Sequence, residues 1–138
     1  MSTAPPNTIA HMTLAPGLRA SRTIMVERED TAIAAGSGDV PVLATPRLLA
    51  FAEGVTTAAI AKELEPGQTS VGTRVELSHL AATGVGAHVE IAAELTEVEG
   101  RRLVFSVTAV DRRGVLVFTA TIERMLVDRE RFLARITR

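Results

Sequence analysis

The C-terminal half of the chain alternates apolar and polar residues with a period of two. The pattern covers four segments, residues 71–79, 89–96, 103–109 and 115–127. Successive side chains of a β-strand point to opposite faces, so this period predicts strands with one apolar and one polar face. In the first of them, it places Val71, Thr73, Val75, Leu77 and His79 on one face. Short turns at 99–100 and 111–114 join the last three strands into an antiparallel meander.

One long helix precedes these strands. Thr45 followed by Pro46 predicts a helix N-cap and the first helical position, and Glu65-Pro66-Gly67 predicts the end of the helix. Apolar residues recur between them at helical spacing: Leu48, Leu49, Ala52, Val55, Ala59 and Ile60. A helix of about five turns can cross a whole small domain. Residues 18–26 predict a strand before the helix, and residues 129–138 predict an amphipathic terminal helix anchored by Leu126, Phe132, Leu133 and Ile136.

The apolar stripe of the helix and the apolar face of the sheet can bury each other. We therefore expect an α+β fold in which an antiparallel sheet of about five strands wraps around one long central helix. A length of 138 residues with 46% apolar residues is typical of one domain with its own core. The domain is expected at 18–138, after a loose N-terminal tail at 1–17 that is small, polar and proline-containing.

Composition excludes several classes of function. A net charge of -1 gives no electrostatic reason to bind nucleic acid or an anionic membrane. The absence of cysteine excludes disulfides, thiolate metal sites and a cysteine nucleophile. The three histidines are scattered without metal-ligand spacing, so no metal is expected. Because no apolar run has the length of a signal peptide or a membrane span, we expect a cytoplasmic protein.

Three polar residues in apolar surroundings could perform acid/base chemistry on a small substrate. They are Thr45, Glu53 eight residues later, and His79 at the end of the first predicted strand after the helix. Each also has an ordinary structural interpretation. Thr45 could serve only as a helix cap, Glu53 could be a solvated residue at the edge of the stripe, and His79 could be a hydrogen-bonded core histidine.

The order of strand, long helix and four-strand antiparallel meander is similar to that of the hotdog fold. The segments 64–73, 78–83 and 94–103 resemble the fluoroacetyl-CoA thioesterase family, in the spacing of Thr45, Glu53, Gly72 and His79. The resemblance implies a homodimeric acyl-CoA thioesterase with Thr45, Glu53 and His79 as catalytic residues and Gly72 near the thioester. It also makes Arg124 a candidate contact of the pocket or of CoA. Coenzyme A would then be part of the substrate, and no separate cofactor is expected.

These residue types suit thioester hydrolysis. A neutral imidazole such as His79 can accept a proton at pH 7, and the Glu53 carboxylate could act as a base or attack the carbonyl itself. Gly72 could let the ligand approach the backbone, and its amide is a candidate donor to the oxyanion. Residues 36–43 contain no aromatic that could close over a small fluorinated group, so a small or medium acyl group is expected rather than fluoroacetyl selectivity. A hotdog acyl-CoA hydratase and a non-catalytic acyl-thioester-binding domain remain alternatives.

Overall fold

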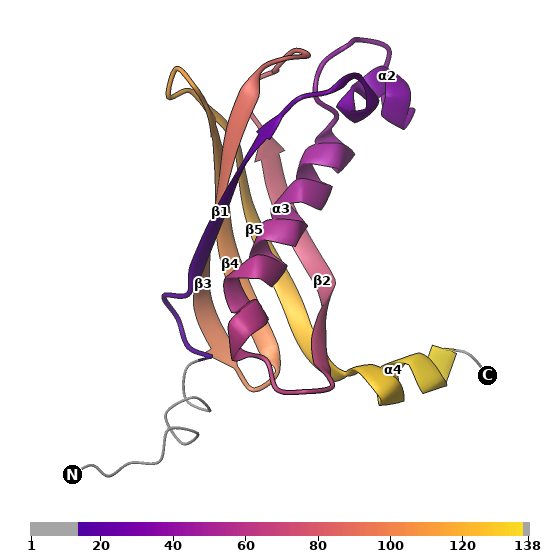
Figure 1. The fold of residues 1–138 in the computed structure, drawn as a ribbon, viewed down its shortest axis with the longest axis vertical. Coiled ribbons are helices and arrows are strands. Elements are labelled where there is room, and N and C mark those ends of the chain that lie inside the picture. The colour runs from indigo at the N-terminus through magenta and orange to yellow at the C-terminus, as the bar shows by residue number, and fades with distance from the viewer. Residues whose placement is uncertain (1–13, 137–138) are drawn as a thin grey trace.

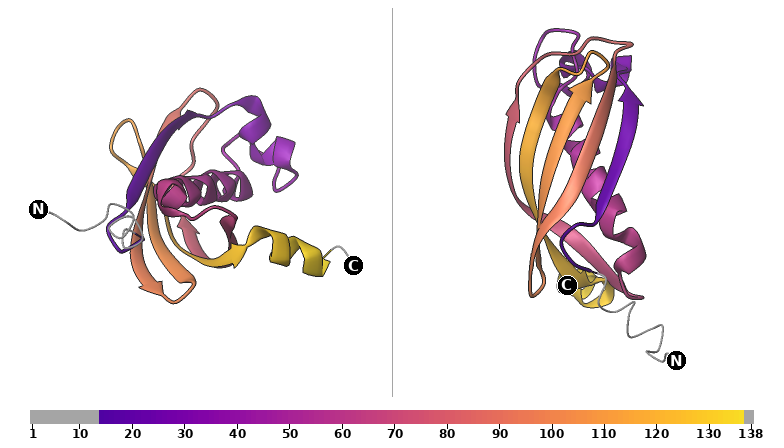
Figure 2. Two further views of the ribbon diagram at one scale, coloured as in Figure 1. Left: turned by 60° about the horizontal axis from the view of Figure 1, so that its bottom comes forward. Right: turned by 90° about the vertical axis from the view of Figure 1, so that its left-hand side faces the viewer.

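The computed structural model describes residues 14–136, and the first thirteen residues of the predicted tail lie outside this range. A five-stranded antiparallel sheet curls around the long helix α3 (Figures 1 and 2). The strands are β1 (Arg19–Met25), β2 (Gln68–His79), β3 (His88–Glu99), β4 (Arg102–Asp111) and β5 (Leu116–Asp128). The helices are η1 (Arg28–Asp30), α2 (Ala32–Ala35), α3 (Thr45–Ile60), η2 (Ala61–Glu63) and α4 (Arg129–Ile136). The expected α+β architecture is confirmed.

The strand order is β1-β3-β4-β5-β2. The predicted meander of the last three strands is confirmed, because β3 pairs with β4 and β4 with β5. The prediction that β2 continues the meander as a fourth strand is wrong. Residues 80–87 form a loop between β2 and β3, and these two strands are not neighbours in the sheet. β2 pairs with β5 and not with β3. Among the described strands, β1 and β2 are therefore the two edges of the sheet.

The core lies between α3 and the concave face of the sheet. The helix buries an apolar stripe, and every second residue of β3, β4 and β5 is buried opposite it. The largest fully buried side chains include Leu48, Ile60, Ile91, Phe105 and Ile122. Burying one such side chain stabilises a fold by about 1.5–3 kcal/mol, so this contact holds α3 in place. The left view of Figure 2 shows the sheet curving around the helix.

A buried carboxylate anchors the N-terminus of α3. Asp30 is 3% exposed, and its Oδ1 accepts a hydrogen bond of 2.7 Å from Arg47 Nε in the first turn of the helix. Its Oδ2 accepts from the Glu27 amide, and its carbonyl accepts from the Ala44 amide. These bonds fix the residue that directly precedes Thr45.

Thr45 is not the N-cap of α3. Ala44 occupies the cap position, with no side-chain cap, and Thr45 is the first residue of the helix. The predicted capping role is therefore wrong, because the Thr45 hydroxyl is used in a contact with β2 rather than with the first turn.

A β-bulge in β2 changes which residues face α3. The register with β5 shifts between Gly72 and Arg74, so Thr73 is an extra residue without a partner. Ser70 and Gly72 pair with the buried residues Leu126 and Arg124 of β5. Val75, Leu77 and His79 pair with the buried residues Ile122, Ala120 and Phe118. The prediction that Val71 and Thr73 share a face with His79 is therefore wrong, because the bulge inverts the alternation before Arg74.

The predicted terminal helix forms as α4, which projects away from the sheet (Figure 1). Of the four predicted anchors, Leu126 is buried in β5 and Phe132 is half-buried, whereas Leu133 and Ile136 are 48% and 63% exposed. Within residues 14–136, no helix combines the length and the apolar character of a membrane span.

Candidate active site

The N-terminus of α3 meets the end of β2 through one hydrogen bond. Thr45 Oγ1 lies 2.7 Å from His79 Nδ1. The imidazole also packs edge-on against Phe118, with the ring centroids 6.5 Å apart. Burial lowers the pKa of His79 below its ordinary value of about 6.5, because the charged form loses solvation. The ring is therefore neutral at pH 7 and can accept a proton.

The second nitrogen of His79 is left without a partner. Nε2 is buried and makes no hydrogen bond to any of residues 14–136. If Thr45 donates its proton to Nδ1, Nε2 carries the ring proton. The hydroxyl and the imidazole then have the geometry of a nucleophile or water-orienting group and its base, without a carboxylate behind the ring.

A second polar cluster lies further along the same helix. Arg124 Nη1 is 3.5 Å from Glu53 Oε2, and its other nitrogens bind Ser70, with Nε donating to Oγ at 2.9 Å and Nη2 to the carbonyl at 3.0 Å. The Arg124 side chain is 8% exposed, whereas that of Glu53 is 37% exposed. Burial lowers the pKa of Arg124, and the charge of Glu53 opposes that shift. An arginine remains charged in proteins, so it provides Glu53 with a buried counter-ion.

Gly72 makes room for the Glu53 carboxylate. A Cβ atom at position 72 would lie 2.5 Å from Glu53 Oε2 and 3.6 Å from Arg124 Nη1. The backbone of Gly72 does not have a positive φ angle, so the space around it, not its conformation, excludes a side chain. Gly72 therefore lies both at the bulge and beside a candidate catalytic group.

The structure brings the candidate residues together in two groups rather than one. Thr45 contacts His79, and Glu53 lies with Gly72 and Arg124. Eight residues of helix separate Thr45 from Glu53, which corresponds to about 12 Å along the axis. Gly72 and His79 are separated by about 20 Å of strand. A single chain therefore presents two separate polar clusters at different heights along α3.

A groove of about 330 Å³ opens beside the Thr45–His79 pair. It lies between α2, the segment before α3 and the residues that follow β2. Small and aliphatic side chains dominate its lining: Ala32, Ser37, Val42, Leu43, Ala44, Leu80, Ala81 and Ala82. We call it the acyl groove. Its walls can accommodate an apolar chain next to the imidazole.

Sequence reasoning missed Ser70 and Asp30. Ser70 faces Arg124 only because the bulge inverts the strand, and the alternation of the sequence placed it on the other face. The signal that could have revealed Asp30 is its place in the capping box of η1 with Glu27. Residues 14–136 contain no group of three or more histidine, aspartate or glutamate side chains able to hold a metal ion.

Comparisons with known proteins identify the relatives of this chain. The model of FlK, the fluoroacetyl-CoA-specific thioesterase, matches residues 26–130. The chain belongs to this family. The fluoroacetyl-CoA thioesterase of Streptantibioticus cattleyicolor is 41% identical over 96 residues, which are 69% of this chain and 68% of the relative.

Two solved structures share the fold. A structure of the fluoroacetyl-CoA thioesterase FlK superposes with a TM-score of 0.81 at 33% identity, and the match covers 87% of this chain and 93% of the other. A hypothetical protein of Thermus thermophilus, described as a thioesterase superfamily member, gives a TM-score of 0.83 at 25% identity, covering 91% and 92%. Both confirm the hotdog fold expected from the sequence.

The pKa of His79 can be measured directly. Because burial penalises the imidazolium, the ring protons of His79 should titrate in NMR spectra with a midpoint below 6.5. The unfolded chain then binds this proton more readily than the folded one. The stabilisation from the neutral ring should be complete above pH 6.5 and should be lost as the pH falls through the folded-state pKa. A midpoint above 6.5 would contradict this assignment, and a His79→Gln variant identifies the resonance.

Proposed function

We propose that this chain hydrolyses acyl-CoA thioesters to a free acid and CoA. The observation that carries the proposal is the 2.7 Å contact between Thr45 and a neutral His79, beside a groove lined mainly by small and aliphatic residues, in a member of the fluoroacetyl-CoA thioesterase family. In the reaction the C–S bond breaks, a C–O bond forms to an oxygen that comes from water, and the thiolate leaves and takes up a proton. An acyl-CoA substrate agrees with the cytoplasmic location expected from the sequence.

The candidate residues divide the chemistry between them. His79 takes a proton from water or from the Thr45 hydroxyl. The contact with Thr45 also orients the imidazole. Glu53 supplies a carboxylate that activates water or attacks the thioester, and Arg124 holds it in place through the contact at 3.5 Å. The amide of Gly72, beside Glu53, is the candidate donor to the oxyanion. These roles require both polar clusters to meet at one thioester.

A homodimer paired through β2 would bring the clusters together. β2 is an edge strand of 12 residues, and an unprotected edge of that length readily pairs with another chain. An antiparallel contact about a two-fold axis near the middle of β2 places the His79 end of one strand beside the Gly72 region of the other. Each active site would then combine Thr45 and His79 of one chain with the Glu53 cluster of the second.

The lining of the acyl groove supports a small or medium straight acyl group. Ala32, Val42 and Ala81 leave space beside His79, and residues 36–43 provide no aromatic to close over a fluorinated methyl group. Fluoroacetyl selectivity, which the names of the relatives state for those proteins, is therefore not part of the proposal.

Release of free thiol from a panel of acyl-CoAs tests the activity. We expect turnover of acetyl-, butyryl- and hexanoyl-CoA, with no marked preference for fluoroacetyl-CoA. The variants His79→Ala and Glu53→Gln should melt like wild type and should lose about 10²- to 10⁴-fold in rate, which is the usual effect of removing an acid/base group. Normal turnover in both folded variants would refute the site. Water addition to an enoyl-CoA without thiol release would indicate the hydratase alternative.

Space at Gly72 is tested by a matched pair of substitutions. Gly72→Ala places a methyl group against Glu53 Oε2 and should lower turnover by up to about 10²-fold, because displacing a catalytic group by an ångström has effects of that size. Gly54→Ala is the control, since nothing lies within 4 Å of its Cβ position on α3. It should retain wild-type turnover. Equal activity of the two variants would show that Glu53 does not need its observed position.

Mixed dimers test the shared site. Chains carrying His79→Ala and chains carrying Glu53→Gln are inactive alone in this account. After random assortment, half of the dimers are mixed and each mixed dimer has one intact site of two, so about one quarter of wild-type activity should return. No recovery in dimers that are verified as mixed by mass would mean that both residues act within one chain.

A further inference from the structure

A second groove lies next to the acyl groove. It has a volume of about 340 Å³ and lies between the loop after β2 and the turn that joins β4 to β5. Its lining is Ala82, Thr83, Gly84, Gly86, Ala87, His88, Asp111, Arg112 and Arg113. Ala82 lines both grooves, so the two are adjacent. We call it the Arg112 groove. We propose that it binds the phosphate groups of coenzyme A, an inference that rests on the proposed thioesterase function.

The turn supplies a cation that no residue of the described range 14–136 neutralises. No ion pair of the exposed Arg112 side chain is recorded within residues 14–136. Arg113 behaves differently, because its Nη2 contacts Asp111 Oδ2 at 3.1 Å. Hydrogen bonds from the Val115 amide, and also from Arg113, lower the pKa of Asp111 and keep it ionised. The Asp111–Arg113 pair is therefore neutral as a unit, and Arg112 gives the groove a net positive charge.

The opposite wall contains a hydroxyl with unmet hydrogen-bonding capacity. Thr83 is 6% exposed, and its Oγ1 has no partner among the described residues. The Thr83 carbonyl accepts a hydrogen bond from the Leu43 amide, so this wall is fixed to the segment that leads into Thr45. Gly84 and Gly86 have open space at their Cβ positions and leave the entrance wide.

The position of the groove matches the shape of the substrate. His79 pairs with Phe118 of β5, and Arg112 precedes Phe118 by six residues. At most about 20 Å of extended chain therefore separates Phe118, which lies beside His79, from Arg112. Coenzyme A carries its diphosphate at the far end of the long pantetheine arm. The pantetheine arm is therefore long enough to place phosphates near Arg112 when the thioester is held at His79 and the acyl chain occupies the acyl groove. Figure 1 shows the β4–β5 turn and the loop before β3 at the same end of the molecule as α2.

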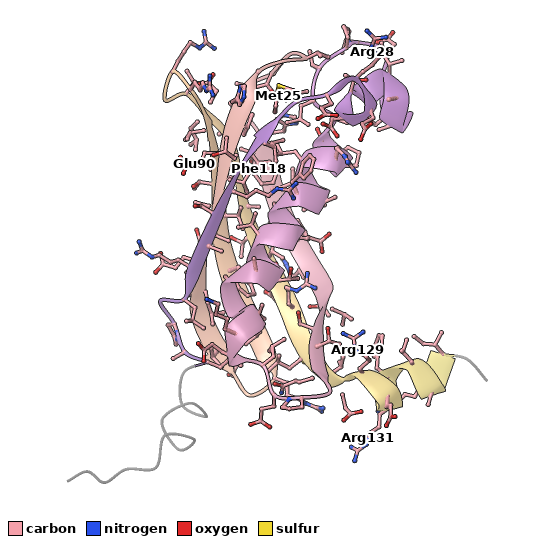
Figure 3. All side chains as sticks on the ribbon, in the orientation of Figure 1. Met25, Arg28, Glu90, Phe118, Arg129 and Arg131 are labelled. Carbon is pink, nitrogen blue, oxygen red and sulfur yellow. The ribbon has the colours of Figure 1, made fainter. Side chains whose placement is uncertain are left out.

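The arginines of α4 are cations that could compete for the phosphates. Figure 3 shows Arg129 and Arg131 at one end of the folded molecule and Arg28 at the other end, where α2 lies. They could reach a phosphate only from a second chain. Arg131 therefore provides a matched control: the same substitution, on an exposed arginine, at a place that the proposal does not use.

Calorimetric titration with coenzyme A, dephospho-coenzyme A and pantetheine tests the proposal without requiring turnover. Arg112→Gln should weaken coenzyme A binding about tenfold, as expected for one charge-assisted contact, while Arg131→Gln should not. Pantetheine has no phosphate and should bind both variants like wild type. If Arg112→Gln also weakens the binding of dephospho-coenzyme A, Arg112 contacts the diphosphate. If it weakens the binding of coenzyme A alone, Arg112 contacts the ribose phosphate.

The proposal is overturned if Arg112→Gln binds coenzyme A like wild type, or if it weakens pantetheine equally, which would indicate a structural role. Weakening by Arg131→Gln alone would assign the phosphates to α4. These outcomes can be distinguished from a failure of the proposed function. A protein that binds coenzyme A through Arg112 but releases no thiol would support the phosphate site and contradict the thioesterase activity.

Discussion

The bulge at Thr73 decides which side chains of β2 reach the central helix. Without this extra residue, the alternation of the strand would turn Gly72 and Ser70 away from α3. With it, Ser70 binds Arg124 through both its hydroxyl and its carbonyl, and Gly72 leaves the space that the Glu53 carboxylate occupies. The position of the only acidic group in the candidate site therefore depends on one local irregularity in hydrogen-bond register.

The N-terminal end of α3 shows a different way of fixing a functional group. Thr45 is held from two sides, because Asp30 binds the backbone of Ala44 and the side chain of Arg47, and the Thr83 carbonyl binds the Leu43 amide. Burial of the apolar stripe fixes the rest of the helix. The Thr45 hydroxyl is therefore held in contact with His79 and makes no capping bond to its own helix. Ala44 at the cap position has no side chain to make a capping bond, which is worth about 1 kcal/mol in other helices, so the backbone contacts of Asp30 and Thr83 hold this end of α3.

Much of the fold could be predicted from the sequence because it depends on periodic burial. The apolar stripe of α3, the hairpin at Gly100 and the alternation of β3 to β5 are local signals, and the structure confirms them. The edge position of β2 and its bulge depend on long-range pairing with β5, which no local pattern specifies. The same limit applies to the site. The residue types at Thr45, Glu53 and His79 were recognisable, but their division into two clusters follows from the tertiary register, and Ser70 became visible only with it.

The central claim is that one thioester contacts the two clusters from two different chains. A crystal structure of the dimer with a non-hydrolysable acyl-CoA analogue tests it most directly. The account predicts that one carbon of the analogue, the one at the place of the thioester carbonyl carbon, lies within about 3.5 Å of an attacking group. That group is positioned by His79 of one chain and Glu53 of the other. An analogue held by His79 and Glu53 of the same chain, with β2 unpaired, would contradict it.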